Sequence, residues 1–448
     1  MPEKQKSSLV PMLIIGLLFF IFGFVTWLNG SLIPTLQIAF NLTPSQAYLI
    51  SMAFYISYTV TALPLSVVLN HTGYKFGMVI GFLLMMLGSL IFIPAAQMRS
   101  FEIFLAGLFI LGSGLTILQT AACPYMVLLG KRETAAVRIC FMGILNKGAG
   151  IIAPIVFTSL VFTDVSQYSP SALSQMSGAQ QLITLNTLSA KLVTPYLAMA
   201  IILLVLAMCV LLSPLPECDL ERVNQEKPEH YDNPFKYPHL ILGVMALFFA
   251  AGTEVVAADT IGLLGKAFNV TNFSSLTAYT MAFMVIGYIL GISLIPRWIK
   301  QEKALLFTSL LGTVITYLII NSSGQLYTIW NTWFLWTHAP AVPNVVVLVA
   351  MLGLVNAIIW PSIWPLALKG LNRKTMTIGS AMLVMSFSGG AMLPMLYAEL
   401  GSTSENMISA YLVLIPCYLF IAFYAALGHK VNQWNRVINL EQSSTCNS

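Results

Sequence analysis

Residues 193–213 read VTPYLAMAIILLVLAMCVLLS, and residues 214–230, which follow directly, read PLPECDLERVNQEKPEH. The first segment is apolar and contains no Asp, Glu, Lys or Arg, whereas the second contains no apolar run. The hydrocarbon core of a bilayer is about 30 Å thick, so an α-helix needs about 20 apolar residues to cross it. Residues 193–213 therefore predict a transmembrane helix, and the polar segment after them predicts a linker outside the membrane.

Apolar runs of this kind recur throughout the 448 residues. Hydrophobic residues make up 58% of the chain and charged residues only 8%, and the mean hydropathy is +0.83. A soluble globular domain carries about 25% charged residues. This composition excludes a soluble enzyme, a secreted disulfide scaffold, a disordered chain and a nucleic-acid-binding protein. The runs are continuous, whereas the strands of a membrane barrel alternate, so we predict an all-α integral membrane protein.

Twelve runs are long enough to span a bilayer, and the polar linker divides them into six and six. We predict an N-terminal segment at 1–10, a six-helix bundle at 11–213, a linker at 214–238, a second six-helix bundle at 239–428 and a tail at 429–448. The longest loops on the side opposite the linker are 164–192 and the aromatic segment 322–343. The predicted spans are 11–36, 47–69, 77–97, 102–128, 136–162, 193–213, 239–264, 275–296, 303–321, 344–368, 376–398 and 407–428.

The basic residues predict the orientation of these spans. Of the 21 Lys and Arg residues, seventeen fall in the termini, the linker and the loops on one side, and only Arg99, Lys191 and Lys266 fall on the other. Lys147 is the one that remains, inside a span. Because cytoplasmic loops are enriched in Lys and Arg, both termini are predicted to be cytoplasmic, which requires an even number of spans.

The two halves carry a weak internal repeat. Pro follows a polar amide by five residues in spans four and ten, and Phe-Phe precedes Gly in spans one and seven. These matches predict two pseudo-symmetric halves, an arrangement typical of secondary transporters. The matching positions are Gln119 and Pro124 with Asn356 and Pro361, Gly150 and Pro154 with Gly390 and Pro394, and Phe19, Phe20 and Gly23 with Phe248, Phe249 and Gly252.

Three ionisable residues lie deep inside predicted spans, namely Lys147, Glu254 and Asp259. Burying a charge in the bilayer is costly, so such residues are functional candidates. We predict that Glu254 binds substrate or a cation, and that Asp259 and Lys147 take part in cation coupling. Alternatively, Glu254 forms a structural ion pair, and Lys147 is a counter-ion that keeps a carboxylate charged.

The uncharged polar residues of the spans are suited to a sugar. Amides match the donor and acceptor pattern of sugar hydroxyls, and aromatic rings pack against the C–H faces. The predicted substrate-binding set is Trp27, Asn29, Gln119, Asn146, Glu254, Asn356 and Trp360. The alternative for the amides is hydrogen bonding between helices. The segment from Gly262 to Lys266 lacks the spacing of a phosphate loop, and we predict no cofactor and no bound metal.

Several motifs carry a resemblance to a known family. They are FGFVTWLNGSLIP at 22–34, LQTAACPY at 118–125, NKGAG at 146–150 and NAIIWP at 356–361. Together they resemble the fucose–galactose–glucose:proton symporter family of the major facilitator superfamily. The similarity covers nearly the whole chain and is closest to glucose/galactose or N-acetylglucosamine permease-like members. The resemblance implies a sugar importer of the bacterial inner membrane that works by alternating access and cation-coupled symport.

The chain also departs at two positions from the family that it resembles. The fucose permease uses an Asp in span one and a Glu in span four, and the matching positions here are Gly30 and Gln119, which cannot titrate. Under the repeat Gly30 corresponds to Asp259, so we expect the coupling carboxylate to be Asp259 or Glu254. Proton and sodium coupling both stay open, as do a sugar uniporter and a major facilitator carrier for a non-sugar solute. We expect a monomer surrounded by lipid, with a small sugar as substrate and no nucleic-acid partner.

Overall fold

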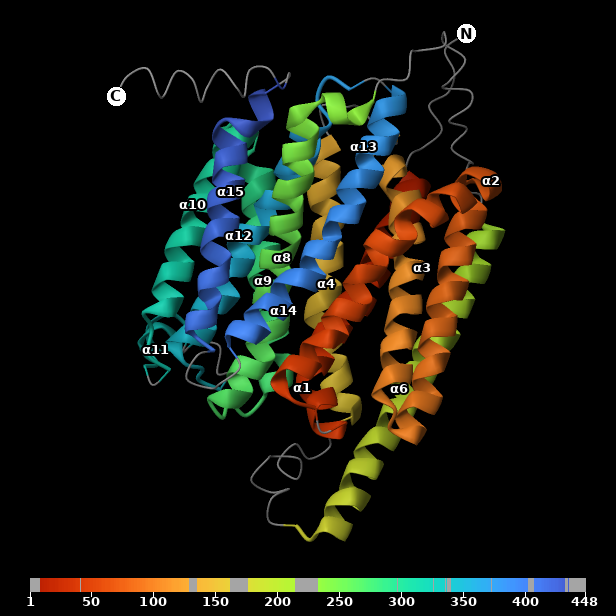
Figure 1. Cartoon of the computed structure of the whole chain (residues 1–448), viewed down its shortest axis with the longest axis vertical. Helices are drawn as coiled ribbons and strands as arrows, with labels where there is room; N and C mark the ends of the chain where they lie inside the picture. The colour runs from red at the N-terminus through yellow and green to blue at the C-terminus, as the bar shows by residue number, and fades with distance from the viewer. Residues whose placement is uncertain are drawn as a thin grey trace.

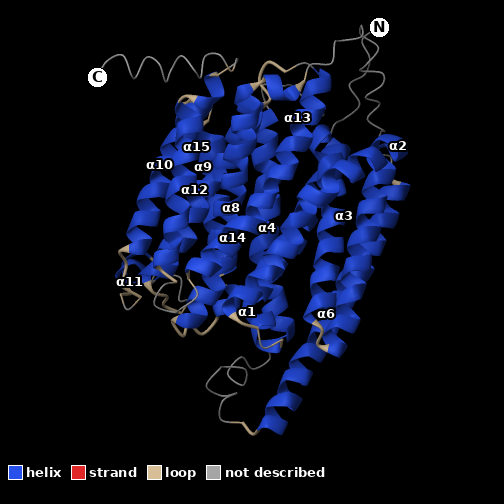
Figure 2. Cartoon of the chain, viewed as in Figure 1, coloured by secondary structure: helices blue, strands red, loops and turns tan. Residues whose placement is uncertain are grey.

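A computed structural model describes residues 9–40, 42–128, 135–161, 176–213, 233–295, 297–324, 326–334, 336, 340–371, 373–401, 407–431 and 434. Every regular element in these ranges is a helix (Figure 2). Most of the predicted terminal segments and most of the linker fall outside the described residues. The division into two domains at 214–238 therefore stays a prediction.

Five long helices form the first half of the described chain: α1 (Leu9–Ala39), α2 (Pro44–Met98), α3 (Phe101–Leu128), α4 (Ala135–Val161) and α6 (Gly178–Leu212). The element α2 contains predicted spans two and three, which meet at Gly73. Gly73 has φ 78°, a left-handed conformation that glycine adopts without steric cost, and it interrupts the helical geometry there.

The second half begins with the short 3-10 helix η3 (Pro234–Lys236). The elements after it are α8 (Pro238–Ala267), η4 (Phe273–Ser275), α9 (Thr277–Leu294), α10 (Gln301–Ile320), α11 (Thr328–Trp333), α12 (Asn344–Ala367), α13 (Arg373–Met385), η6 (Ser386–Ser388), α14 (Gly389–Leu400), η7 (Ser409–Val413), α15 (Leu414–Ala426) and η8 (Gly428–Lys430). Span eleven is thus divided into α13 and α14 by a 3-10 turn.

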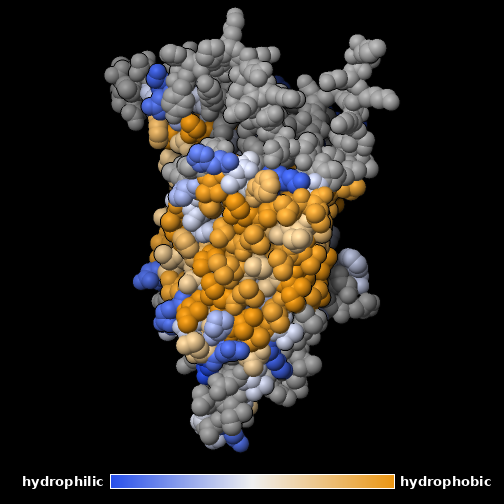
Figure 3. Space-filling view, turned by 90° about the vertical axis from the view of Figure 1, so that its right-hand side faces the viewer, coloured by the Kyte–Doolittle hydropathy of each residue, from blue (hydrophilic) through white to orange (hydrophobic). Residues whose placement is uncertain are grey.

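Ten segments of the described chain are long and apolar enough to cross a membrane by length and composition. The other two predicted spans, 47–69 and 136–162, fall on the first part of α2 and on α4. The count of twelve and the cytoplasmic termini remain predictions. The surface carries a broad apolar belt with hydrophilic residues gathered toward both ends, as expected for a bilayer-embedded protein (Figure 3).

The predicted loop at 164–192 is wrong for its second part, because α6 begins at Gly178. The side chain of Ser177 accepts a hydrogen bond from the backbone N–H of Gln180, and the side chain of Gln180 accepts one from the backbone N–H of Ser177. This capping box satisfies backbone donors at the start of the helix, so the helix forms well before the apolar run. Residues 178–192 are largely polar, so hydropathy did not predict this first part of α6. Residues 162–175 lie outside the described residues.

The helices of the two halves lie side by side (Figure 1). Within the first half, α2 packs against α3 and α6, and α1 packs against α4. Within the second half, α12 packs against α8, α9 and α10. The halves meet where α4 contacts α9, where α2 contacts α14 and where α1 contacts α8.

Equivalent glycines mark close helix contacts in the two halves. A Cβ built on Gly23 of α1 would lie 1.9 Å from the backbone oxygen of Asn146 in α4. A Cβ built on Gly252 of α8 would lie 2.9 Å from the backbone oxygen of Gly389 in α14. An added methyl group would clash at both positions, so the missing side chain of glycine allows the helices to approach this closely. The repeat predicted for spans one and seven thus coincides with a repeated helix contact.

Candidate functional site

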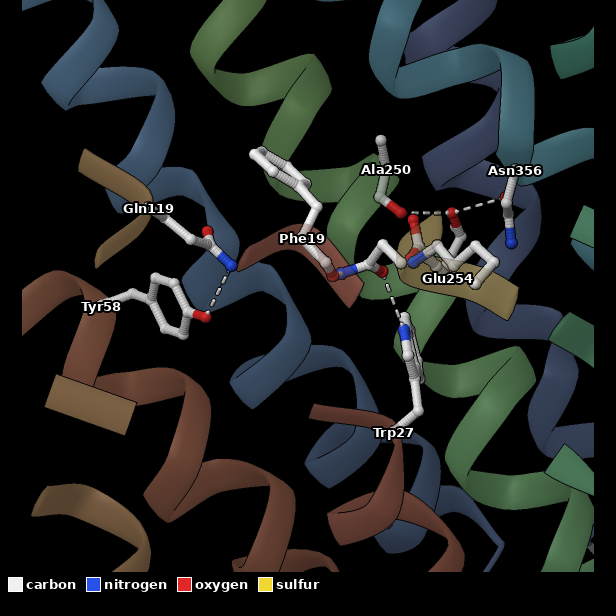
Figure 4. A network of polar contacts seen from close by, with 10 residues as sticks. Phe19, Trp27, Tyr58, Gln119, Ala250, Glu254 and Asn356 are labelled. Carbon is white, nitrogen blue, oxygen red and sulfur yellow. Dashed lines mark hydrogen bonds and ion pairs between the residues drawn. The ribbon is translucent and has the colours of Figure 1, made fainter. Parts of the chain in front are cut away.

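A series of polar contacts joins α1 and α4 (Figure 4). Trp27 Nε1 donates to Asn146 Oδ1 at 3.2 Å, and Asn146 Nδ2 donates to the backbone oxygen of Phe19 at 3.2 Å. The close contact at Gly23 brings the helices near enough for both bonds. Both polar atoms of the Asn146 side chain are therefore used in joining two helices of the same half.

Lys147, the next residue of α4, points across to the other half. Its Nζ donates to Glu254 Oε1 of α8 in an ion pair, and the Nζ lies 4.0 Å from the centroid of the Trp27 ring. The Lys147 side chain is 8% exposed and that of Glu254 16%. The ring face adds a favourable cation–π contact to the ion pair. Lys147 and Glu254 are thus counter-ions, which was one of the two alternatives left open by the sequence.

Asn356 of α12 is anchored through its oxygen. Tyr418 donates to Asn356 Oδ1 at 2.9 Å, and Thr253 Oγ1 donates to the same atom at 3.3 Å. The residue is only 2% exposed, yet its Nδ2 has no hydrogen-bond partner in the described part of the chain. Thr253 precedes Glu254 on α8, so Asn356 adjoins the ion pair (Figure 4).

Gln119 of α3 belongs to an aromatic group that reaches across the two halves. Its Nε2 donates to the hydroxyl of Tyr58 at 3.2 Å. The Tyr58 ring lies 5.7 Å from that of Phe387, and Phe387 lies 6.4 Å from Trp360 of α12. The Trp360 Nε1 is buried without a partner in the described chain. Gln119 and Trp360 are therefore linked through rings from α2 and η6.

Asn29 and Asp259 form a further part of the site. Asn29 is 5% exposed, and its Nδ2 has no partner among the described residues. Asp259 is 3% exposed, and Ser51 Oγ of α2 donates to its Oδ2. The Oδ1 of Asp259 lies against Gly30 of α1. A Cβ added to Gly30 would lie 2.0 Å from this oxygen. Among the described residues Asp259 forms no ion pair.

The structure thus brings together Trp27, Asn146, Lys147, Glu254 and, through Thr253, Asn356. Gln119 and Trp360 lie in a separate aromatic group, and Asp259 contacts α1 and α2 instead of Lys147. Sequence reasoning missed the residues that support these groups, namely Ser51, Thr253, Phe387 and Tyr418. Their only available signal was a polar or aromatic side chain within an apolar span, which many packing residues share.

A cavity of about 300 Å³ lies between α1, α4 and α6. Its described lining consists of apolar side chains, among them Phe24, Leu28 and Ile202, and includes none of the predicted site residues. A sugar needs hydrogen-bonding partners, so this cavity does not have the chemistry of a sugar site. The described residues also contain no group of three His, Cys, Asp or Glu side chains arranged to hold a metal ion.

Comparison with known protein families gives a match to the Major Facilitator Superfamily over residues 15–395. The match agrees with the arrangement of two helical halves around buried polar groups. The chain belongs to the Major Facilitator Superfamily. This membership confirms the predicted major facilitator fold and membrane transport as the general function.

Two relatives and one solved structure illustrate where the chain falls within the superfamily. It is 31% identical over 437 residues to a glucose/galactose transporter of Brucella abortus, covering 96% of each chain. It is 26% identical over 434 residues to the L-fucose-proton symporter of Escherichia coli, covering 94% of each. The crystal structure of the transporter FucP in the outward conformation matches with a TM-score of 0.70 and 26% identity, covering 94% of this chain and 99% of that one. These similarities confirm the resemblance to the sugar symporters of the superfamily.

Proposed function

We propose that this transporter imports a hexose of the glucose/galactose class, or N-acetylglucosamine, together with a proton across the inner membrane of a bacterium. The sugar would be held between the halves by Asn29, Gln119, Asn356 and the rings of Trp27 and Trp360. Asn146, whose polar atoms both bond to α1, would position Trp27. The relatives named as glucose/galactose transporters and as a fucose–proton symporter support both the substrate class and the coupling ion. We expect it to act as a monomer in the lipid bilayer, without a cofactor.

One observation carries the sugar assignment. Asn29 Nδ2, Asn356 Nδ2 and Trp360 Nε1 are buried donors with no acceptor in the described chain. A buried donor left unpaired costs about 1–3 kcal/mol, so an acceptor at these positions is favourable. Hydroxyl and ring oxygens of a sugar are such acceptors, and the neighbouring Trp rings suit its C–H faces. An apolar substrate would leave all three donors unpaired.

The two buried carboxylates, Glu254 and Asp259, are suited to different roles in the transport cycle. Glu254 has a cationic partner in Lys147, which stabilises its charge. Asp259 has one hydroxyl donor and forms no ion pair among the described residues. Burying its charge is unfavourable, and protonation removes that cost. We therefore assign proton binding to Asp259, and to Glu254 and Lys147 an interaction between the halves that the sugar can modulate.

Uptake in reconstituted proteoliposomes tests the function. We expect saturable uptake of radiolabelled galactose or glucose, inhibition by an excess of either sugar or of N-acetylglucosamine, and acceleration when the outside is made acidic. A weakly buffered external medium should become more alkaline as sugar enters, with no requirement for sodium.

The other outcomes identify the alternatives. If no hexose is taken up or exchanged, the sugar assignment is wrong, and a carrier for a non-sugar solute becomes the better description. If hexose enters without proton movement and without sodium, the protein is a uniporter. A strict sodium requirement would replace the proton as the coupling ion.

A further inference from the structure

The apolar cavity between α1, α4 and α6 opens toward the bilayer. Val156 of α4 is 39% exposed and Ile202 of α6 is 57% exposed, and both lie within predicted spans, where the surroundings are lipid. On the inner side of the cavity, Leu28 of α1 is 5% exposed and Leu203 of α6 is 1% exposed. The lining thus runs from the lipid-facing surface into the interior of the first half. We call this cavity the lateral groove.

The size and chemistry of the lateral groove fit a hydrocarbon chain better than water. The groove has a volume of about 300 Å³, and all of its described lining side chains are apolar. An apolar cavity of about 150 Å³ stays free of water and holds one benzene molecule. Water in the lateral groove would lose hydrogen bonds against this lining, whereas an acyl chain loses none when it moves there from the bilayer. The bilayer supplies such chains at the open side of the groove.

The length of the lateral groove matches the depth of one leaflet. Its α6 wall extends from Pro195 to Leu203, which is a rise of about 12 Å at 1.5 Å per residue. One leaflet contributes half of the hydrocarbon layer of about 30 Å, which is about 15 Å. The wall forms the first part of the predicted span 193–213, which begins at the side that the charge distribution predicts to be external. The acyl chains next to the groove are therefore expected to be those of the external leaflet.

A basic residue lies one helical turn beyond the groove on the same face of α6. Lys191 precedes Pro195 by four residues, which places it on the same side of the helix and about 6 Å closer to the predicted external end. Long basic side chains at the end of a span extend their charged group toward the lipid headgroups. An ammonium group at that level attracts the phosphate of an anionic lipid. The groove and Lys191 thus match the two parts of one lipid molecule.

We propose that the lateral groove binds one acyl chain of an anionic phospholipid from the external leaflet, and that the phosphate of this lipid contacts Lys191. The bound chain completes the packing of α6, which lies mainly against α2 and makes few contacts with α1 and α4. A lipid that binds the folded protein in this way stabilises it. This role is independent of the solute that the protein carries, so the inference goes beyond the proposed function and does not rest on it.

Native mass spectrometry of the delipidated protein, titrated with dioleoyl phosphatidylglycerol, tests the inference. The parent should retain one lipid molecule in detergent that removes the surrounding lipid. Its melting temperature should rise by about 2–5 °C when the site is saturated, because the lipid binds the folded state. Glycerol phosphate, which has the charged group but no acyl chain, should produce neither effect.

Two adjacent isoleucines of α6 provide a matched pair of variants. Ile202 lines the groove and is 57% exposed, whereas Ile201 is 56% exposed and does not belong to the described lining. Ile202→Trp fills the groove with a larger side chain, so the retained lipid and the thermal shift should be lost. Ile201→Trp adds the same ring to the neighbouring surface and should behave like the parent. Val156→Trp, which fills the groove from α4, repeats the test if Ile202→Trp does not fold.

Lipids with different headgroups test the contact with Lys191. Phosphatidylglycerol should bind about fivefold more tightly than phosphatidylethanolamine with the same acyl chains, because one basic residue near an anionic lipid contributes about 1 kcal/mol. Lys191→Gln should remove most of this preference, and Lys191→Arg should keep it. Lys303→Gln, in the first turn of α10, is the control for the loss of a positive charge elsewhere and should keep the preference.

Each other result contradicts a stated part of the inference. A parent that retains no lipid, or an Ile202→Trp variant that retains it as the parent does, excludes the groove as the binding site. Equal binding of the two lipids, or a preference that persists in Lys191→Gln, excludes the phosphate contact. A dimer of the parent that Ile202→Trp dissociates would make the groove an interface between two copies. Hexose uptake enters none of these measurements, so failure of the lipid site and failure of the sugar assignment are distinguishable.

Discussion

Asn356 presents its two amide atoms to different surroundings. The oxygen accepts hydrogen bonds from Thr253 and Tyr418, whereas the buried nitrogen has no acceptor in the described chain. The oxygen contacts fix the orientation of the amide, which leaves the nitrogen as the atom available to a substrate. Tyr418 and Thr253 are therefore positioning residues in this interpretation.

Asn356→Ala should weaken hexose binding by about 5- to 150-fold, since a sugar oxygen left without its donor in the buried site costs about 1–3 kcal/mol. Substrate affinity measured by competition or calorimetry checks this. Tyr418→Phe removes one oxygen contact and keeps the nitrogen, so its effect on affinity should be much smaller. Asn321→Ala, at the exposed end of α10, serves as the control. Equal effects of Asn356→Ala and Asn321→Ala would contradict the assigned contact.

The ion pair of Lys147 and Glu254 leads to a second prediction at this scale. Lys147→Met leaves a largely buried carboxylate without its counter-ion, and the expected cost is about 3–5 kcal/mol of stability. Combining Lys147→Met with Glu254→Met removes both charges and should recover most of that loss. Thermal unfolding in detergent at one pH compares the parent, the single variants and the double variant. A double variant as unstable as Lys147→Met would show that the pair does not act as a unit.

The residue types of the site could be predicted from the sequence, but their partners could not. Buried amides and charges are conspicuous in apolar spans, which is why Asn146, Lys147 and Glu254 were found. Whether Asn146 contacts sugar or a neighbouring helix depends on helix rotation, and the structure places both of its polar atoms on α1. The partner of Asp259 could not be predicted either, because its contact with Ser51 depends on how the two halves pack against each other.

At the scale of elements, the contact of α1 with α4 depends on Gly23. Gly23→Ala should lower the melting temperature, because the new Cβ would lie 1.9 Å from the Asn146 backbone oxygen. Gly148→Ala, also within a helix, should leave it unchanged or raise it, since alanine is favoured over glycine in helices by about 1 kcal/mol and the site is open. Opposite signs for the two variants are expected in a thermal unfolding assay. Two equal shifts would mean that helix propensity, and not the contact, decides the result.

Hydropathy predicted the helices well where a span is uniformly apolar. It predicted them poorly where a helix begins with polar residues or is interrupted by a 3-10 turn. The runs that became α9, α10 and α12 were found to within a few residues. The polar start of α6 was missed, because its capping box at Ser177 is a local backbone signal that a hydropathy window ignores. The interruption between α13 and α14 was also missed, since Gly389 and Gly390 are common residues in membrane helices.

At the scale of the molecule, alternating access requires the ends of the halves that are predicted to be external to separate. Gln37 and Lys266 bridge these ends, so joining them should stop transport. Gln37→Cys with Lys266→Cys, treated with a short reducible bifunctional thiosulfonate, should lose uptake and regain it on reduction. Lys75→Cys with Ser213→Cys is the matched control, because Lys75 Nζ donates to the Ser213 oxygen within one half. Undiminished uptake by the joined Gln37–Lys266 variant would exclude movement at this end.

The helix α6 has a practical consequence for imaging. It contains 35 residues, which at 1.5 Å per residue is about 52 Å, whereas the hydrocarbon layer is about 30 Å thick. Its first turns project beyond the neighbouring helices (Figure 1). A small transporter hidden in a detergent micelle offers few landmarks for aligning particles in electron microscopy. This projecting end of α6 is an epitope to which an antibody fragment could be raised, and the bound fragment would provide such a landmark.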